Sequence, residues 1–118
     1  MAPSSQRAYY DSGIWVACMF SKDKFFRQGT VLIQELEERG EIAVISHLAI
    51  METIHVIRRK IMGNIRQAEN TEKARNDAMS KSNREVKRFI MYVSELQERG
   101  NAEIIPVSYT HLTLPTKA

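Results

Sequence analysis

Cysteine is almost missing from this sequence, since Cys18 is the only one among 118 residues. One thiol cannot form an internal disulfide, and it cannot build a zinc site from several thiolates. Disulfides are also rare in reducing compartments, which suits a chain with a single cysteine. We therefore expect a cytoplasmic protein whose fold and chemistry do not depend on cysteine.

Long apolar runs and several well-known enzyme signatures are missing as well. No segment approaches the roughly 20 apolar residues of a membrane-spanning helix, and residues 1–7 lack the apolar stretch of a secretory signal. The sequence contains no P-loop, no G-x-S-x-G elbow and no G-x-G-x-x-G fingerprint. These absences argue against a membrane protein, a P-loop enzyme, an α/β-hydrolase and a dinucleotide-binding enzyme.

The composition that is present suits one globular domain. Hydrophobic residues make up 43% of the chain and charged residues 26%, over a length of 118 residues, which is typical of a single domain with its own core. Positive charge gathers in one segment: from Arg58 to Arg88 there are ten basic and four acidic residues, a net charge of +6 within a chain total of +3. Such a segment is typical of polyanion-binding proteins, and a solvated helix face is an equal alternative.

Strand and helix patterns alternate along the chain. We expect strands near residues 6–10, 42–45 and 104–105 and helices near 14–20, 25–39, 47–62 and 86–99, with 63–83 as a loop or an exposed helix. Gly40 and Gly100 are placed to end helices, and Ser46 is placed to cap one. Strands that alternate with helices indicate an α/β fold with a parallel sheet.

Apolar residues at helical spacing predict which helix faces are buried. The expected faces are Phe25, Gly29, Leu32 and Leu36; Ile50, Ile54, Ile57 and Ile61; and Phe89, Ile90, Val93 and Leu96. Trp15 and the methionines at 51, 62, 79 and 91 are interpreted as further core residues.

The composition changes after about residue 106, where threonine becomes frequent. Residues 107–118 (VSYTHLTLPTKA) closely resemble the translation of a sequencing adaptor. We therefore take residues 1–107 as the domain and exclude 108–118 from fold reasoning as an extraneous tail. A natural C-terminal β-hairpin is the alternative.

Two acidic residues are the candidates for chemistry. Asp11 follows the first expected strand, and ligands of open α/β sheets bind at the carboxyl ends of strands; alternatively, Asp11 caps the next helix. Glu52 is the only acid between Glu41 and Glu69 and lies in an apolar helix. A buried carboxylate needs compensation by a metal ion or by a basic partner such as Arg59; alternatively, Glu52 is partly exposed on the helix rim.

A metal site that uses both acids would suit Mg²⁺ or Mn²⁺. Mg²⁺ takes few carboxylates, retains waters and accepts phosphate oxygens, and a bound metal can generate hydroxide for phosphodiester hydrolysis. A phosphoryl-transfer enzyme with Asp11 as nucleophile is a weaker interpretation, because Gly13 stands where its second Asp is expected.

Two segments resemble the PIN domain family. Residues 9–17 (YYDSGIWVA) are similar to the opening of PIN domains, where a strand ends in a metal-binding Asp followed by Thr or Ser. Residues 45–59 (ISHLAIMETIHVIRR) are similar to the second motif, a metal-binding Glu in an apolar helix followed by basic residues. The resemblance covers roughly residues 7–107. It implies a PIN-like three-layer α/β/α fold with a central parallel sheet.

Residue by residue, the resemblance implies that Asp11 and Glu52 are catalytic metal ligands, which the Ser12 hydroxyl helps to orient. Gly13 departs from the Asn or Ser often found at its position, so a substrate-orienting side chain is missing there. The basic residues after the second motif would contact nucleic acid; they are Arg58, Arg59 and Lys60.

The implied function is a Mg²⁺-dependent endoribonuclease of the VapC-like toxin type, which hydrolyses RNA phosphodiesters. The implied partners are the RNA substrate, a cognate antitoxin protein and a second copy in a homodimer of the full-length protein. The family's third and fourth acids follow the strand at residues 103–106 and have no counterpart before the tail. We therefore expect a fold that is incomplete at its C-terminus and inactive, and the alternative is a non-catalytic RNA- or protein-binding α/β domain.

Overall fold

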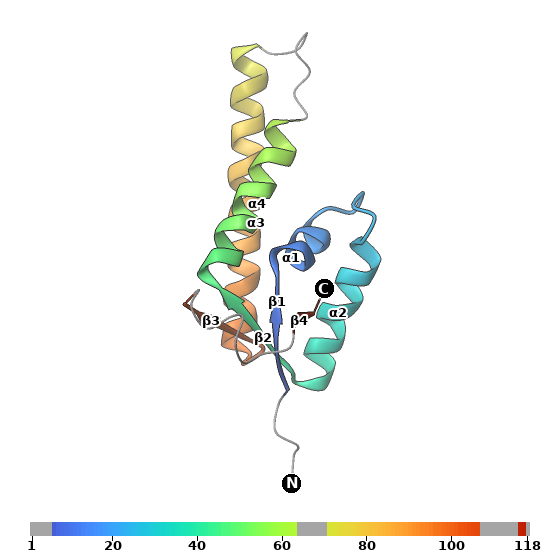
Figure 1. The fold of residues 1–118 in the computed structure, drawn as a ribbon. Helices are drawn as coiled ribbons and strands as arrows, with labels where there is room; N and C mark the ends of the chain where they lie inside the picture. The colour runs from blue at the N-terminus through green and yellow to red at the C-terminus, as the bar shows by residue number, and fades with distance from the viewer. Residues whose placement is uncertain (1–5, 64–70, 107–115, 118) are drawn as a thin grey trace.

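The computed structural model describes residues 6–63, 71–106 and 116–117 (Figure 1). Its elements in chain order are β1 (Arg7–Tyr10), α1 (Ser12–Met19), α2 (Phe26–Arg39), β2 (Ile42–Ser46), α3 (His47–Met62), α4 (Glu72–Glu98), β3 (Ala102–Ile105) and β4 (Thr116–Lys117). The strands form one sheet in the order β3-β2-β1-β4, and every neighbouring pair is parallel. The expected α/β class with a parallel sheet is confirmed.

The register of β1, β2 and β3 sorts their side chains onto two faces. Paired residues of parallel strands point to the same side, and successive residues of one strand point to opposite sides. One side carries the rows Ala8–Ala43–Ala102 and Ile45–Ile104, and we call it the alanine face. The other side carries the rows Arg7–Ile42, Tyr9–Val44–Glu103 and Ser46–Ile105.

All four helices contribute to the core on the alanine face. The core cluster joins the strand alanines and Ile45 to residues of every helix, among them Trp15, Leu36, Ile57 and Phe89. The Trp15 ring lies 5.9 Å from the Tyr10 ring and 6.2 Å from the Phe89 ring, measured between centroids. Its indole N–H donates to the Tyr10 carbonyl at 3.2 Å. Trp15 is therefore a core residue, as predicted.

The opposite face of the sheet is crossed by an ion pair. Arg7 Nη2 lies 2.7 Å from Glu103 Oε2, so the pair joins β1 to β3 across β2. Val44, on this side of β2, is fully buried. Within the described residues the helices and the sheet form two packed layers, and the third layer of the expected arrangement is not seen there.

Two helices end in the same way before a strand begins. Gly40 and Gly100 adopt the left-handed region, with φ of 64° and 78°, which suits residues without a Cβ. In each case the residue after the glycine donates its N–H to a buried leucine carbonyl, Glu41 to Leu36 and Asn101 to Leu96. The Asn101 side chain ties the two ends together, because Nδ2 donates to the Glu41 carbonyl at 2.8 Å. The predicted glycine stops are confirmed.

Several expected core residues lie elsewhere. Phe25 precedes α2 and is 52% exposed, and Ile90 is 45% exposed although Phe89 beside it is buried. Met51, Met79 and Met91 are also exposed, so their interpretation as core residues was wrong. Helical spacing marks apolar stripes but does not fix which of two adjacent stripes meets the sheet.

The polar segment at residues 63–83 divides into two parts. Residues 64–70 lie outside the described residues, and Thr71 caps a helix that begins at Glu72. The alternative of an exposed helix therefore holds for residues 72–83. None of the helices in the described part of the chain is long and apolar enough to cross a membrane.

The tail is described at only one point. Thr116 and Lys117 form β4 and pair in parallel with Tyr9 and Tyr10 of β1. The expected boundary at residue 107 and the alternative hairpin lie outside the described residues.

Candidate functional site

Asp11 lies directly after β1, at the start of α1. Its Oδ1 accepts the backbone N–H of Ile14 at 3.3 Å, and its extended backbone is that of an N-cap residue. The capping alternative is therefore confirmed. The cap uses one carboxylate oxygen, which leaves Oδ2 for another partner.

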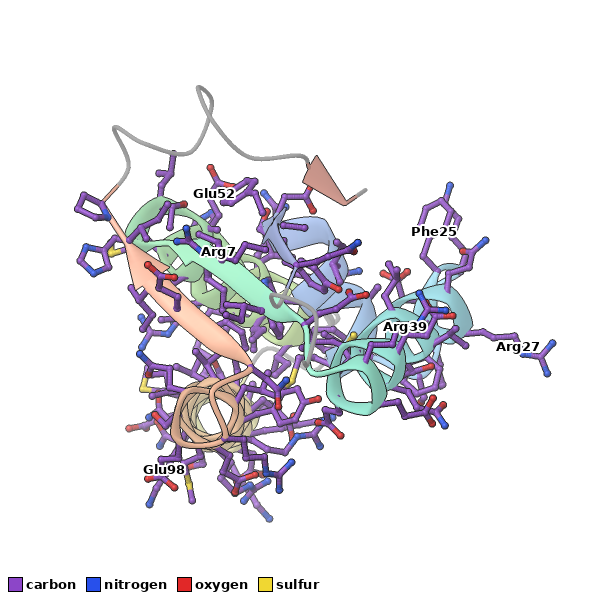
Figure 2. All side chains as sticks on the ribbon, turned by 90° about the horizontal axis from the view of Figure 1, so that it is seen from below. Arg7, Phe25, Arg27, Arg39, Glu52 and Glu98 are labelled. Atoms are coloured by element: carbon purple, nitrogen blue, oxygen red, sulfur yellow. The ribbon has the colours of Figure 1, made fainter. Side chains whose placement is uncertain are left out.

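Glu52 lies on α3, and it is exposed. The prediction that it is buried was wrong, because the buried face of α3 follows Ala49, Thr53, Ile57 and Ile61. Glu52 lies about 100° around the helix from Thr53. Figure 2 shows Glu52 on the side of α3 that faces away from α4. Among the described residues it forms no ion pair with Arg59.

Ser12 joins the two candidate acids. Its hydroxyl donates to Glu52 Oε2 at 3.0 Å, across 40 positions of sequence. Ser12 follows Asp11 directly, and α1 packs against α3. Because β1 and β2 are parallel neighbours, the residues after their carboxyl ends meet at one edge of the sheet. The structure thus brings Asp11, Ser12 and Glu52 to that edge.

The first turn of α3 is held firmly at this edge. The buried Ser46 hydroxyl accepts the Ala49 N–H at 3.0 Å and lies 3.1 Å from the Tyr9 hydroxyl. One turn further on, the Thr53 hydroxyl donates to the Ala49 carbonyl at 2.7 Å. The predicted cap at Ser46 is confirmed, and it fixes the first turn of α3, directly before the turn that carries Glu52.

The donor chemistry of this edge fits Mg²⁺ or Mn²⁺. Asp11 and Glu52 offer carboxylate oxygens, the ligands these hard cations prefer. The part of the chain that the structure describes contains no group of three or more His, Cys, Asp or Glu able to hold a metal ion. Waters and substrate oxygens would therefore have to complete the coordination, as they commonly do around Mg²⁺.

A cavity of about 770 Å³ lies between α1 and α2, beside Asp11. Asp11 and Glu35 are its acidic lining residues, and Phe25 is its aromatic one. Gly13 lies at the same place, where an added Cβ would come within 3.3 Å of Asp11 Oδ1. The sequence does not mark Glu35 as a functional residue, because it lies among the charged residues of positions 35–39.

A second cavity, of about 630 Å³, is lined by Cys18, Tyr92 and residues of α2 and α4. Burial raises the pKa of Cys18 to about 11, so its thiol is protonated at neutral pH. Burial, followed by the Glu37 charge, also raises the pKa of Tyr92. Burial therefore favours the neutral forms of both side chains.

The basic residues Arg58, Arg59 and Lys60 are all exposed near the end of α3. As consecutive helical residues they point in different directions. Arg59 follows Glu52 by seven residues and so shares its face, about 10 Å along the axis. Lys60 turns towards the residue after α1, with Nζ 5.6 Å from the Phe20 ring centroid.

In comparisons with known proteins, the chain matches no protein-family model, no curated protein and no solved structure.

Proposed function

We propose that this chain carries the metal-binding edge of a PIN-type endoribonuclease, which hydrolyses RNA phosphodiesters with Mg²⁺ or Mn²⁺. The observation that carries the proposal is the hydrogen bond from Ser12, the residue directly after Asp11, to Glu52, 40 residues further along the chain. The resemblance to PIN domains implies the same three residues. A cognate antitoxin and a second copy of the chain are proposed partners on the same basis.

Each of the three side chains has a distinct task in this proposal. Asp11 Oδ2 and Glu52 Oε1 would hold the cation, while Asp11 Oδ1 stays on the helix cap and Ser12 fixes Glu52 Oε2. When bound, the metal would supply an activated water and stabilise negative charge on the phosphate. Arg59 lies on the face of α3 that carries Glu52, where it would hold a neighbouring phosphate of the RNA.

The described residues provide only two carboxylates at this edge, so we expect weak metal binding and little or no cleavage by this chain. More acids around a site lower the energy of a bound divalent cation. This chain would therefore carry only the metal-binding edge, Asp11, Ser12 and Glu52, and a full catalytic site would need further acids.

Isothermal titration calorimetry with MnCl₂ tests the proposal. We expect Asp11→Asn and Glu52→Gln each to weaken Mn²⁺ binding at least roughly tenfold, because each removes one charged ligand. Asparagine is as good an N-cap as aspartate, so Asp11→Asn removes charge without removing the cap. Glu98→Gln is the matched control, because Glu98 is exposed on the opposite side of the molecule (Figure 2).

The outcome separates the nuclease from a non-catalytic RNA-binding domain. Mn²⁺ binding that survives both substitutions would overturn the metal edge and, with it, the nuclease. RNA binding by a protein that shows no Mn²⁺ binding would favour the binding domain, and the exposed cations of α3 and α4 would then be its RNA contacts.

A further inference from the structure

The outer face of α4 carries a row of cations that the metal edge does not use. Lys73, Lys81, Arg84 and Lys87 are all exposed, and we call them the α4 basic stripe. They follow one another at eight, three and three residues, so they fall on one side of the helix. The buried residues Ser82, Val86, Phe89, Val93 and Leu96 lie on the other side. The stripe therefore faces away from the core.

The geometry of α4 leaves this side accessible. Figure 1 shows the α3–α4 pair extending beyond the sheet and beyond α1 and α2, with the first turns of α4 at its far end. From Lys73 to Lys87 the stripe is about 21 Å long, at 1.5 Å per residue. A length of this order spans several phosphates of a nucleic-acid strand.

The charges of the stripe are not balanced within the protein. Among the described residues, Lys73, Lys81, Arg84 and Lys87 form no ion pair. Arg84 has like charges three residues before it and three residues after it, an arrangement that destabilises an isolated helix. Asp77 is the only acid in the row, and it lies between Lys73 and Lys81.

Several arginines elsewhere in the chain are paired with acids. Arg7 pairs with Glu103, Arg39 with Glu35 and Glu41, and Arg99 with Glu37. Even Arg88, at the foot of the stripe, is engaged by Glu85 at 3.4 Å and by the Met19 carbonyl at 3.5 Å. A face kept only for solubility would mix both signs of charge. The stripe instead matches a ligand of repeated negative charge.

We propose that the α4 basic stripe binds the phosphate backbone of RNA outside the metal edge, as a second contact that holds the substrate. This inference rests on the proposed function for the identity of the polyanion, but it does not depend on metal binding. Because the contact is made to phosphates, it would be independent of base sequence and sensitive to salt.

The test measures fluorescence anisotropy of a labelled RNA stem–loop in EDTA, with Asp11→Asn/Glu52→Gln as the starting protein. Lys81→Gln/Arg84→Gln/Lys87→Gln should weaken binding at least roughly tenfold and lower the slope of log K against log salt by about three, one for each phosphate contact. The control Lys22→Gln/Lys24→Gln/Arg27→Gln removes the same net charge from exposed residues near the start of α2. It should change the slope by less than one.

A gain of affinity gives a second readout that does not depend on a triple substitution. Asp77→Asn removes the only acid in the row and should tighten RNA binding roughly twofold or more, with a steeper salt slope. Lys, Arg and Gln have similar helix propensity, so we expect each variant to keep its helices. Circular dichroism and thermal unfolding check this.

Three outcomes would overturn the stripe. The first is an equal loss of RNA affinity in the stripe variant and the control variant. The second is no RNA binding by the starting protein. The third is binding to phosphatidylserine vesicles that depends on the stripe, with no binding to RNA. Failure of the Mn²⁺ test with stripe-dependent RNA binding intact would reject the metal edge alone. RNA binding that does not depend on the stripe residues, together with Mn²⁺ binding that depends on Asp11 and Glu52, would reject this inference alone.

Discussion

The side chains of Asp11 and Cys18 show how single residues divide structural and chemical roles. Asp11 caps α1 with one oxygen and keeps the other free, so the structural and the chemical interpretation of this residue are compatible. Cys18 sits on the same helix, and burial raises the pKa of its thiol from 9.0 to about 11. Its surroundings favour the neutral, unreactive form.

This pKa predicts the alkylation behaviour of Cys18. Iodoacetamide reacts with the thiolate, so at pH 8 the folded protein should react roughly a hundredfold more slowly than the urea-unfolded chain. The rate in the folded protein should rise with pH towards a midpoint near 11.

The raised pKa of Cys18 also makes the stability of the folded protein fall at high pH. Because folding raises the pKa of this thiol, its contribution to stability is complete below about pH 9 and is lost as pH rises through about 11. A pH–rate midpoint near 9 in the folded protein would contradict the assignment.

At the scale of elements, α2 and α4 end by one device. Each has a buried leucine, Leu36 or Leu96, whose carbonyl accepts an N–H from the residue after a left-handed glycine. The chain then enters β2 or β3 next to its neighbour, and Asn101 links the two junctions. Residues 35–40 (ELEERG) and 95–100 (ELQERG) are also similar in sequence, so similar segments here form similar structure.

Alanine at either glycine should destabilise the fold through backbone strain alone. A Cβ at Gly40 or Gly100 meets no atom within 4 Å, and both residues have positive φ. We expect Gly40→Ala and Gly100→Ala each to lower the free energy of unfolding by about 1–2 kcal/mol. Urea denaturation measures this change, with Ser80→Ala on the exposed side of α4 as a control. An effect at only one of the two glycines would show that the two ends are not equivalent.

At the scale of the whole molecule, one core couples every helix to the sheet. Phe89 of α4 packs on Trp15 of α1, which packs on Tyr10 of β1. The same core positions the candidate site, since α1 carries Ser12 and α3 carries Glu52. Substitutions that disrupt the core should therefore also disturb the positions of Ser12 and Glu52.

Phe89 and Ile90 are neighbours on α4, one buried and one exposed, so their substitutions test which side of α4 packs into the core. Phe89→Ala should cost about 3–5 kcal/mol of unfolding free energy, because it empties a fully buried site. Ile90→Ala should cost less than about 1 kcal/mol, because Ile90 is 45% exposed. Thermal and urea unfolding followed by Trp15 fluorescence compare them, and equal losses would contradict the observed orientation of α4.

The sequence by itself determined the local structure. Alternating apolar patterns predicted three strands and the helices between them, and Gly40, Gly100 and Ser46 marked helix ends and a cap, because these signals act over a few neighbouring residues. It also singled out Asp11, Ser12 and Glu52, which the structure brings to one edge of the sheet.

Only the tertiary structure decided which sides of the helices are buried and which distant residues meet. The sequence pattern predicted that Ile90 would be buried with Phe89 and that Glu52 would be buried as well. The packing of α3 and α4 on the sheet exposes both Ile90 and Glu52. The contact of Ser12 with Glu52, and the cavity that Asp11 and Glu35 both line, depend on how α1 lies between α2 and α3. Helical periodicity repeats along one element and carries no information about the partner it will pack against, so these features follow from the assembled core.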